Sequence, residues 1–179
     1  MNNLANIRKK PHGLAAGISS MILEIRKDSI KQSLRDLNTV EHRQSYVATV
    51  DGVMYYDDSK AESVNATWFT FENILSPVVW IAGGDDKCSN FAELKPAVRR
   101  TVRALICVGN DAKLKAAFDD DIKEIHQVTS IEEAVDKASQ IAEKDDIVLF
   151  SPACRTGRNA ESNTEHGMRY IESVKRLEE

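Results

Sequence analysis

The sequence has no excess of positive charge: 24 lysines and arginines stand against 28 aspartates and glutamates, which gives a formal net charge of −4. A protein that coats a phosphate backbone needs the opposite balance, so we expect no nucleic-acid partner. Long apolar runs are also missing. None approaches the ~18 residues that span a bilayer, so no membrane insertion is expected. With 42% hydrophobic and 29% charged residues, the composition is that of a globular chain.

Cysteine is scarce as well. Cys88, Cys107 and Cys154 form an odd set without C-x-x-C spacing, which fits a reducing cytoplasm better than a disulfide scaffold or a zinc site. The histidines other than His42 are scattered without metal-ligand spacing. We therefore expect a cytoplasmic protein with no metal site and with a buried, inert thiol at Cys154.

The sequence also lacks the motif of a phosphate-binding loop. The spacing G-x-x-x-x-G-K-[ST] occurs nowhere in the chain. Without that cradle for phosphates, the chain can contribute to a nucleotide site but does not build one. No catalytic residue is expected within it.

The hydrophobic pattern changes near residue 40. Before it, apolar residues recur at helical spacing over 14–25 and again over 30–37, which predicts two helices. From Tyr46 the period changes to two, and Asp51-Gly52 is a strong two-residue turn signal, so a β-hairpin is predicted. We expect two parts, a helical segment over 1–39 and a domain over 40–179.

Beyond the hairpin, strands and helices alternate to the end of the sequence. Apolar runs that end at glycine or at Ser-Pro predict buried parallel strands, and periodic or capped segments predict the helices between them. The predicted strands are 78–82, 104–108, 124–128 and 147–150, and the predicted helices are 63–74, 91–100, 113–118, one capped by Ser130 and Glu133, and about 165–177. The predicted fold class is α/β: a Rossmann-like, mostly parallel sheet with flanking helices and an N-terminal β-hairpin, preceded by the helical segment.

Such sheets bind ligands beyond the carboxyl ends of their strands, and chemistry-bearing residues follow several of the predicted strands. Asp58 and Lys60 come after the hairpin, where a lysine can hold a carboxylate or phosphate and an aspartate can accept sugar hydroxyls. Lys87 follows the Gly83-Gly84 pair, and Arg43 offers a planar fork for a phosphate or a base. Each motif alone is also typical of a structural turn.

Four segments occur in this order: His42-Arg43, Asp58-Ser59-Lys60-Ala61, the strand and glycine loop over 78–87, and Ser151-Pro152-Ala153-Cys154. Together they resemble the C-terminal domain of the Mur ligases, and among them the enzymes that add D-glutamate. The resemblance runs from about Leu14 to the C-terminus, and the four motifs together are more specific than any one of them. It implies that 1–39 is the end of the family's central ATPase domain and that 40–179 is the Mur ligase C-terminal domain.

The resemblance also implies a function. Such a ligase belongs to bacterial cell-wall peptidoglycan synthesis and uses ATP to join D-glutamate to UDP-N-acetylmuramoyl-L-alanine through an acyl phosphate. The family's ATP and magnesium are held mainly by the central domain, so this chain alone is expected to be inactive. By the same resemblance, Arg43 and Asp58 would bind the nucleotide, and Lys60, Lys87 and Thr156 would bind the amino-acid substrate.

Two departures from the family pattern keep another hypothesis open. Glu62 stands where the family has threonine, and an acid at that place is expected to repel D-glutamate. Residues 155–164 replace a stretch rich in aromatic residues. The alternative is a non-catalytic α/β binding module that kept the framework and lost its ligand chemistry. A third hypothesis, an unrelated flavodoxin-like nucleotide binder, is disfavoured by the missing phosphate loop.

Overall fold

The computed structural model describes residues 42–83, 90–109, 112–155 and 162–178. The chain divides into two units between Thr39 and Val40, and all described residues belong to the second unit. The helices predicted within 1–39 lie outside the described residues. The assignment of that segment to an ATPase domain therefore stays a prediction.

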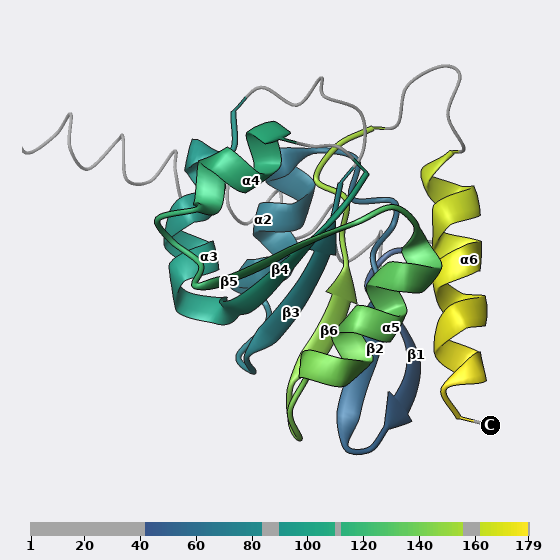
Figure 1. Cartoon of the computed structure of the whole chain (residues 1–179). Helices are drawn as coiled ribbons and strands as arrows, with labels where there is room; N and C mark the ends of the chain where they lie inside the picture. The colour runs from purple at the N-terminus through teal and green to yellow at the C-terminus, as the bar shows by residue number, and fades with distance from the viewer. Residues whose placement is uncertain (1–41, 84–89, 110–111, 156–161, 179) are drawn as a thin grey trace, which may run out of the picture. The chain divides into compact units, whose positions relative to one another are not determined.

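A six-stranded sheet forms the centre of the second unit, in the order β1-β2-β6-β3-β4-β5 (Figure 1). β1 and β2 pair antiparallel, and the other neighbours pair in parallel. This mostly parallel sheet with its hairpin confirms the predicted fold class. The strands are β1 (Ser45–Val50), β2 (Val53–Asp57), β3 (Val78–Ala82), β4 (Val102–Val108), β5 (Glu124–Val128) and β6 (Ile147–Phe150).

Helices cover both faces of the sheet (Figure 1). One face carries α2 (Val64–Glu72), the 3-10 turn η2 (Ala92–Leu94), α3 (Lys95–Thr101) and α4 (Ala112–Phe118). The other face carries α5 (Ile131–Ile141) and α6 (Asn163–Arg176). None of these described helices has both the length and the apolar character needed to cross a membrane.

The strand β3 shows why the sheet has two cores. Every residue of β3 is buried, and successive side chains point to opposite faces. Trp80 packs edge-on against Phe71 and Phe118 in one core, whereas Val79 and Ile81 lie in the other. The continuous apolar run over 78–82 is therefore explained by burial on both faces.

The turn and cap signals of the sequence are borne out in part. Asp51 and Gly52 both have positive φ, 52° and 82°, as a tight hairpin turn requires. Ser130 accepts a hydrogen bond from the backbone N–H of Glu133, as predicted for a cap. The complete capping box lies instead at Ser162 and Glu165, and it starts α6 two residues before the predicted position.

Two of the three cysteines lie in described segments. Cys107 on β4 is buried and takes no part in a disulfide bond. Cys154, just after β6, is disulfide-bonded, so the expectation of a free thiol at this position is wrong. Sequence spacing could not show this, because a disulfide depends on the distance between two cysteines in the fold.

Candidate functional site

The carboxyl ends of β2, β6 and β3 lie side by side, because these strands are parallel neighbours in the sheet. The chain leaves β2 and β6 at this edge, where the N–H of Asp58 donates to the carbonyl of Phe150 over 2.8 Å. Of the predicted site residues, Arg43, Asp58 and Lys60 are described. Lys87 and Thr156 lie outside the described residues, so their roles stay predictions.

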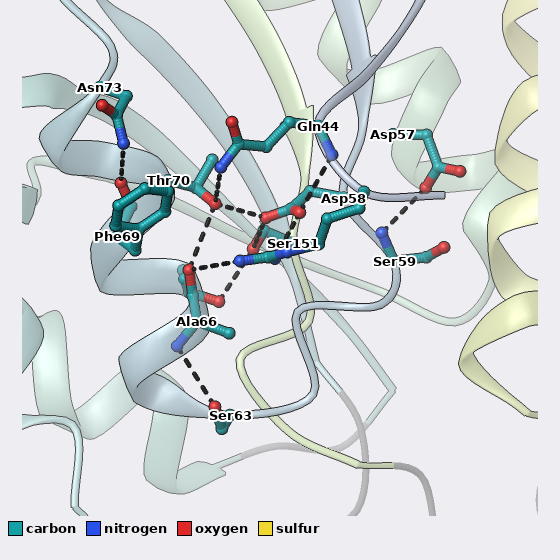
Figure 2. A network of polar contacts seen from close by, with 12 residues as sticks. Gln44, Asp57, Asp58, Ser59, Ser63, Ala66, Phe69, Thr70, Asn73 and Ser151 are labelled. Atoms are coloured by element: carbon teal, nitrogen blue, oxygen red, sulfur yellow. Dashed lines mark hydrogen bonds and ion pairs between the residues drawn. The ribbon is translucent and has the colours of Figure 1, made fainter. Parts of the chain in front are cut away.

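Asp58 is the centre of a buried polar network at this edge (Figure 2). Its Oδ1 accepts hydrogen bonds from Nη1 of Arg43 at 2.5 Å and from the backbone N–H of Gln44 at 3.2 Å. Its Oδ2 accepts from the hydroxyls of Thr70 at 2.7 Å and Ser151 at 3.0 Å. Both carboxylate oxygens are therefore bonded within the chain.

Burial controls the protonation of Asp58, whose side chain has no exposed surface. Removal from water raises its pKa to about 6, although Arg43 and the hydrogen bonds from Thr70, Ser151 and Gln44 act in the opposite direction. At neutral pH the carboxylate is mostly charged, and Arg43 is its counter-ion.

Arg43 connects the start of β1 to α2. Besides its ion pair with Asp58, it donates from Nη2 to the carbonyl of Ala66 at 3.2 Å. Its side chain is only 6% exposed. In this structure the carboxylate oxygens of Asp58 and both Nη atoms of Arg43 are bonded to partners within the chain. Their predicted contacts with a nucleotide stay predictions.

The described side chains also bear on metal binding. Within the described ranges, no group of three histidine, cysteine, aspartate or glutamate side chains is placed to hold a metal ion.

Lys60 differs from Arg43 and Asp58 because no described residue pairs with its ammonium group. The backbone N–H of Lys60 donates to the carbonyl of His42 at 3.1 Å, which fixes the chain at this position. Its side chain is partly exposed and has no hydrogen-bond or ion-pair partner among the described residues. An anchored backbone with a free cation suits a site for an anionic ligand.

The residues on the sheet side of α6 form a second polar cluster that sequence reasoning missed. Nδ1 of His42 lies 2.6 Å from Oδ2 of Asp57, and the N–H of Ser59 donates to Oδ1 of Asp57 at 2.9 Å. Gly167 of α6 packs on this cluster so closely that an added Cβ would lie 2.2 Å from Oγ of Ser59. These Ser, His and Asp side chains are buried, so we assign them to the docking of α6.

Glu62 is paired in the structure, and the expectation that an acid at this place repels D-glutamate stays a prediction. Its Oε2 accepts a hydrogen bond from Nε of Arg155 at 2.8 Å. Both residues occupy positions where the sequence departs from the family pattern. The sequence contained the signal, two opposite charges at departing positions, but not their proximity.

Gly83, the first residue of the predicted glycine loop, has a packing role. Its φ is +138°, and an added Cβ would lie 2.4 Å from the carbonyl oxygen of Val108 at the end of β4. The close backbone approach predicted for a ligand is therefore, at Gly83, an approach to the neighbouring strand. The rest of the loop, 84–89, lies outside the described residues.

Comparison with known proteins gives the family. The family described as "Mur ligase, glutamate ligase domain" matches residues 42–154. The chain is 38% identical over 167 residues to a UDP-N-acetylmuramoylalanine–D-glutamate ligase of Christiangramia forsetii, and 37% identical over 167 residues to the same ligase of Salinibacter ruber. These matches cover 93% of this chain but only 38% and 36% of the two relatives.

Solved structures show the same fold at low sequence identity. A murein peptide ligase of Psychrobacter arcticus is similar with a TM-score of 0.55 and 12% identity, covering 76% of this chain and 30% of that one. A MurF ligase of Thermotoga maritima, solved with ADP, gives a TM-score of 0.51 and 16% identity, covering 78% and 32%. The chain belongs to the Mur ligase family and carries its glutamate ligase domain.

Proposed function

We propose that this chain is the substrate-delivering C-terminal domain of a bacterial, cytoplasmic, ATP-dependent ligase that adds D-glutamate to UDP-N-acetylmuramoyl-L-alanine. Its similarity to D-glutamate ligases over 93% of its length carries the proposal. The chain spans less than two-fifths of those relatives, so ATP and magnesium would be held mainly by residues outside it.

In this proposal Lys60 binds a carboxylate of D-glutamate. Its ammonium is free of partners in the described part of the chain, and its backbone is fixed to His42. A charge-assisted hydrogen bond from a lysine to a carboxylate is among the strong polar contacts in proteins. Lys87 and Thr156 are proposed as further substrate contacts.

Arg43 and Asp58 are proposed to serve the nucleotide side of the same edge. Their ion pair joins the start of β1 to the residues after β2 and, through Thr70, to α2. A rigid connection of this kind holds the Lys60 segment in place while the domain closes on a nucleotide carried by another domain. A direct contact with ribose would require Asp58 to exchange one of its internal partners.

The sharpest test of the function replaces the matched region of the Christiangramia forsetii ligase by this chain. The hybrid should release phosphate from ATP only when D-glutamate and UDP-N-acetylmuramoyl-L-alanine are both present. The 179-residue chain alone should release none. A folded hybrid that accepts a different amino acid, or none, would contradict the proposal.

A binding measurement tests Lys60 directly. Calorimetric titration of the chain with D-glutamate should show binding that Lys60→Met weakens roughly tenfold or more, because a charge-assisted contact is lost. Lys175→Met on the exposed side of α6 is the matched control and should leave the affinity unchanged. Equal affinities for the two variants would remove Lys60 from the site.

The alternative of a non-catalytic module loses part of its basis. It was motivated by Glu62 and by the altered residues 155–164, and Arg155 pairs with the Glu62 carboxylate. Binding of D-glutamate by the unaltered chain would favour the ligase domain. Binding that appears only after Glu62→Thr would favour the module.

A further inference from the structure

The ion pair between Glu62 and Arg155 joins the ends of two neighbouring strands. The last aligned residues of β2 and β6 are Asp57 and Phe150. Glu62 and Arg155 each lie five positions beyond their own member of that pair. They are 93 residues apart in sequence, and parallel pairing of the strands brings them to the same edge as Lys60.

Hydrogen bonds to the backbone at or next to Glu62 and Arg155 fix the positions of both residues. The N–H of Glu62 donates to the carbonyl of Lys60 at 2.9 Å, so the acid sits on a turn that also carries the lysine. On the other side, the buried Asn163 donates from Nδ2 to the carbonyl of Cys154 at 2.9 Å, next to Arg155. The backbone before Arg155 is therefore tied to the start of α6.

Arg155 uses only part of its guanidinium in this pair. A guanidinium has five N–H donors, and Nε alone donates to Glu62. The Nη1 and Nη2 atoms have no partner within the described segments, and the side chain is 81% exposed. The free edge formed by these two nitrogens matches the two oxygens of a carboxylate.

Stability alone does not account for this arrangement. An exposed ion pair contributes about 0–1 kcal/mol, because solvent screens it and both side chains lose freedom. The pair does fix the direction of a cation that would otherwise rotate freely. It also cancels the negative charge that Glu62 brings next to Lys60.

We infer that Arg155 is an additional carboxylate-binding residue at this edge, held in position by Glu62, and that it favours an acidic amino acid over a neutral one. The inference rests on the proposed function for the identity of the amino acid, D-glutamate. Lys60 and Arg155 supply two positive charges against the one negative charge of Glu62, which suits a ligand with two carboxylates.

Titration of the 179-residue chain by NMR, with detection of arginine Nε–H signals, tests the inference. Three probes are compared: D-glutamate, D-glutamine, which lacks the side-chain carboxylate, and glutarate, a dicarboxylate without an amine. D-glutamate should shift the Arg155 signal. Arg155→Gln should reduce the preference for D-glutamate over D-glutamine roughly tenfold.

The pair between Arg100 and Glu72, 3.0 Å long and also exposed, provides the matched control. Arg100→Gln removes an arginine of the same kind from α3 and should leave the preference unchanged. A separate measurement tests whether Glu62 positions Arg155. Glu62→Thr should increase the motion of the Arg155 Nε–H bond in NMR relaxation measurements. Glu62→Gln keeps a hydrogen-bond acceptor for Arg155, so its Nε–H bond should be more ordered than in Glu62→Thr.

The probes separate this inference from the proposed function. If glutarate shifts the Arg155 signal and D-glutamate binds no better than glutarate, Arg155 binds carboxylates and the proposed substrate is wrong. If D-glutamate binds through Lys60 while Arg155→Gln leaves its preference over D-glutamine intact, the inference is overturned and the function stands. If neither acid shifts Arg155, the inference is overturned in every case.

Discussion

Individual side chains at the carboxyl edge of the sheet bond to partners far away in sequence. Asp58 accepts from Ser151, 93 positions later, and Thr67 lies 2.8 Å from the same serine, 84 positions earlier. Because Ser151 gives its proton to Asp58, Thr67 is the donor in the second contact. These contacts make residues after β2, in α2 and after β6 one network.

The protonation of Asp58 is the first prediction at this scale. Its folded pKa of about 6 lies above the unfolded value, so this group's contribution to stability is fully present below pH 3.8 and is lost as pH rises through about 6. NMR titration of the carboxyl carbon should give a midpoint near 6, and Asp58→Asn should remove this transition. A midpoint below 3.8 would mean that Arg43 outweighs burial.

Gly167 provides the second prediction. On helix propensity alone, Gly→Ala should stabilise a helix by about 1 kcal/mol. Here the new Cβ would meet Ser59 and His42, so Gly167→Ala should instead lower the free energy of unfolding by about 1–3 kcal/mol. Urea denaturation measures the change.

A second substitution checks the cause. Oγ of Ser59 is buried without a hydrogen-bond partner in the described structure, so Ser59→Ala should cost little by itself. In the double variant it should recover part of the loss, because the closest atom is gone. Purely additive effects would show that the clash lies elsewhere.

Sequence could identify some residues of the site but not their partners. Lys60 and Asp58 stand out because they follow a strand at the start of a helix. The Glu62–Arg155 pair could not be found, because it depends on β6 lying beside β2. The Arg43 ion pair depends on the register of the β1–β2 hairpin, which shifts between Tyr46 and Ala48. Gly167 carried no signal, since only the docked helix shows why a side chain does not fit there.

At the scale of elements, helix starts depend on which residues act as caps. The predicted capping box at Ser130 is only half formed, because the Glu133 carboxylate accepts from Thr129 and not from the N–H of Ser130. Ser162 and Glu165 form both bonds at the start of α6. The S-x-x-E pattern occurs at both places, so the sequence alone could not tell the complete box from the partial one.

Removal of the Ser162 cap of α6 should therefore lower the stability of the protein measurably. Ser162→Ala should lower the free energy of unfolding by about 1 kcal/mol, because an N–H of the first turn loses its acceptor. Ser162→Gly should cost only a few tenths of that amount. Equal losses in urea denaturation would mean that the cap hydroxyl is not responsible.

For the whole molecule, strand order is the feature that the sequence could not supply. Burial on both faces predicted the parallel strands, since apolar residues occupy every position of β3 and β6. The same pattern says nothing about neighbours. β6, near the end of the chain, lies between β2 and β3 and joins the hairpin to the rest of the sheet.

A truncation tests that arrangement. A chain ended after Lys144 lacks β6 and α6, so β2 and β3 lose their shared neighbour and cooperative unfolding should disappear. Trp80 reports the loss, because its indole N–H donates to the carbonyl of Ser151 at 2.8 Å and its ring is buried. Ending the chain after Leu177 keeps both elements and should preserve the near-ultraviolet circular dichroism of Trp80.

The pairing of Glu62 with Arg155 also makes substitutions at the two positions unequal. Loss of Glu62 leaves Arg155 as an exposed cation that solvent can stabilise, because its side chain is 81% exposed. Loss of Arg155 instead leaves the acid of Glu62 uncompensated beside Lys60. The two positions are therefore coupled, and Glu62 depends on the arginine more than the arginine depends on Glu62.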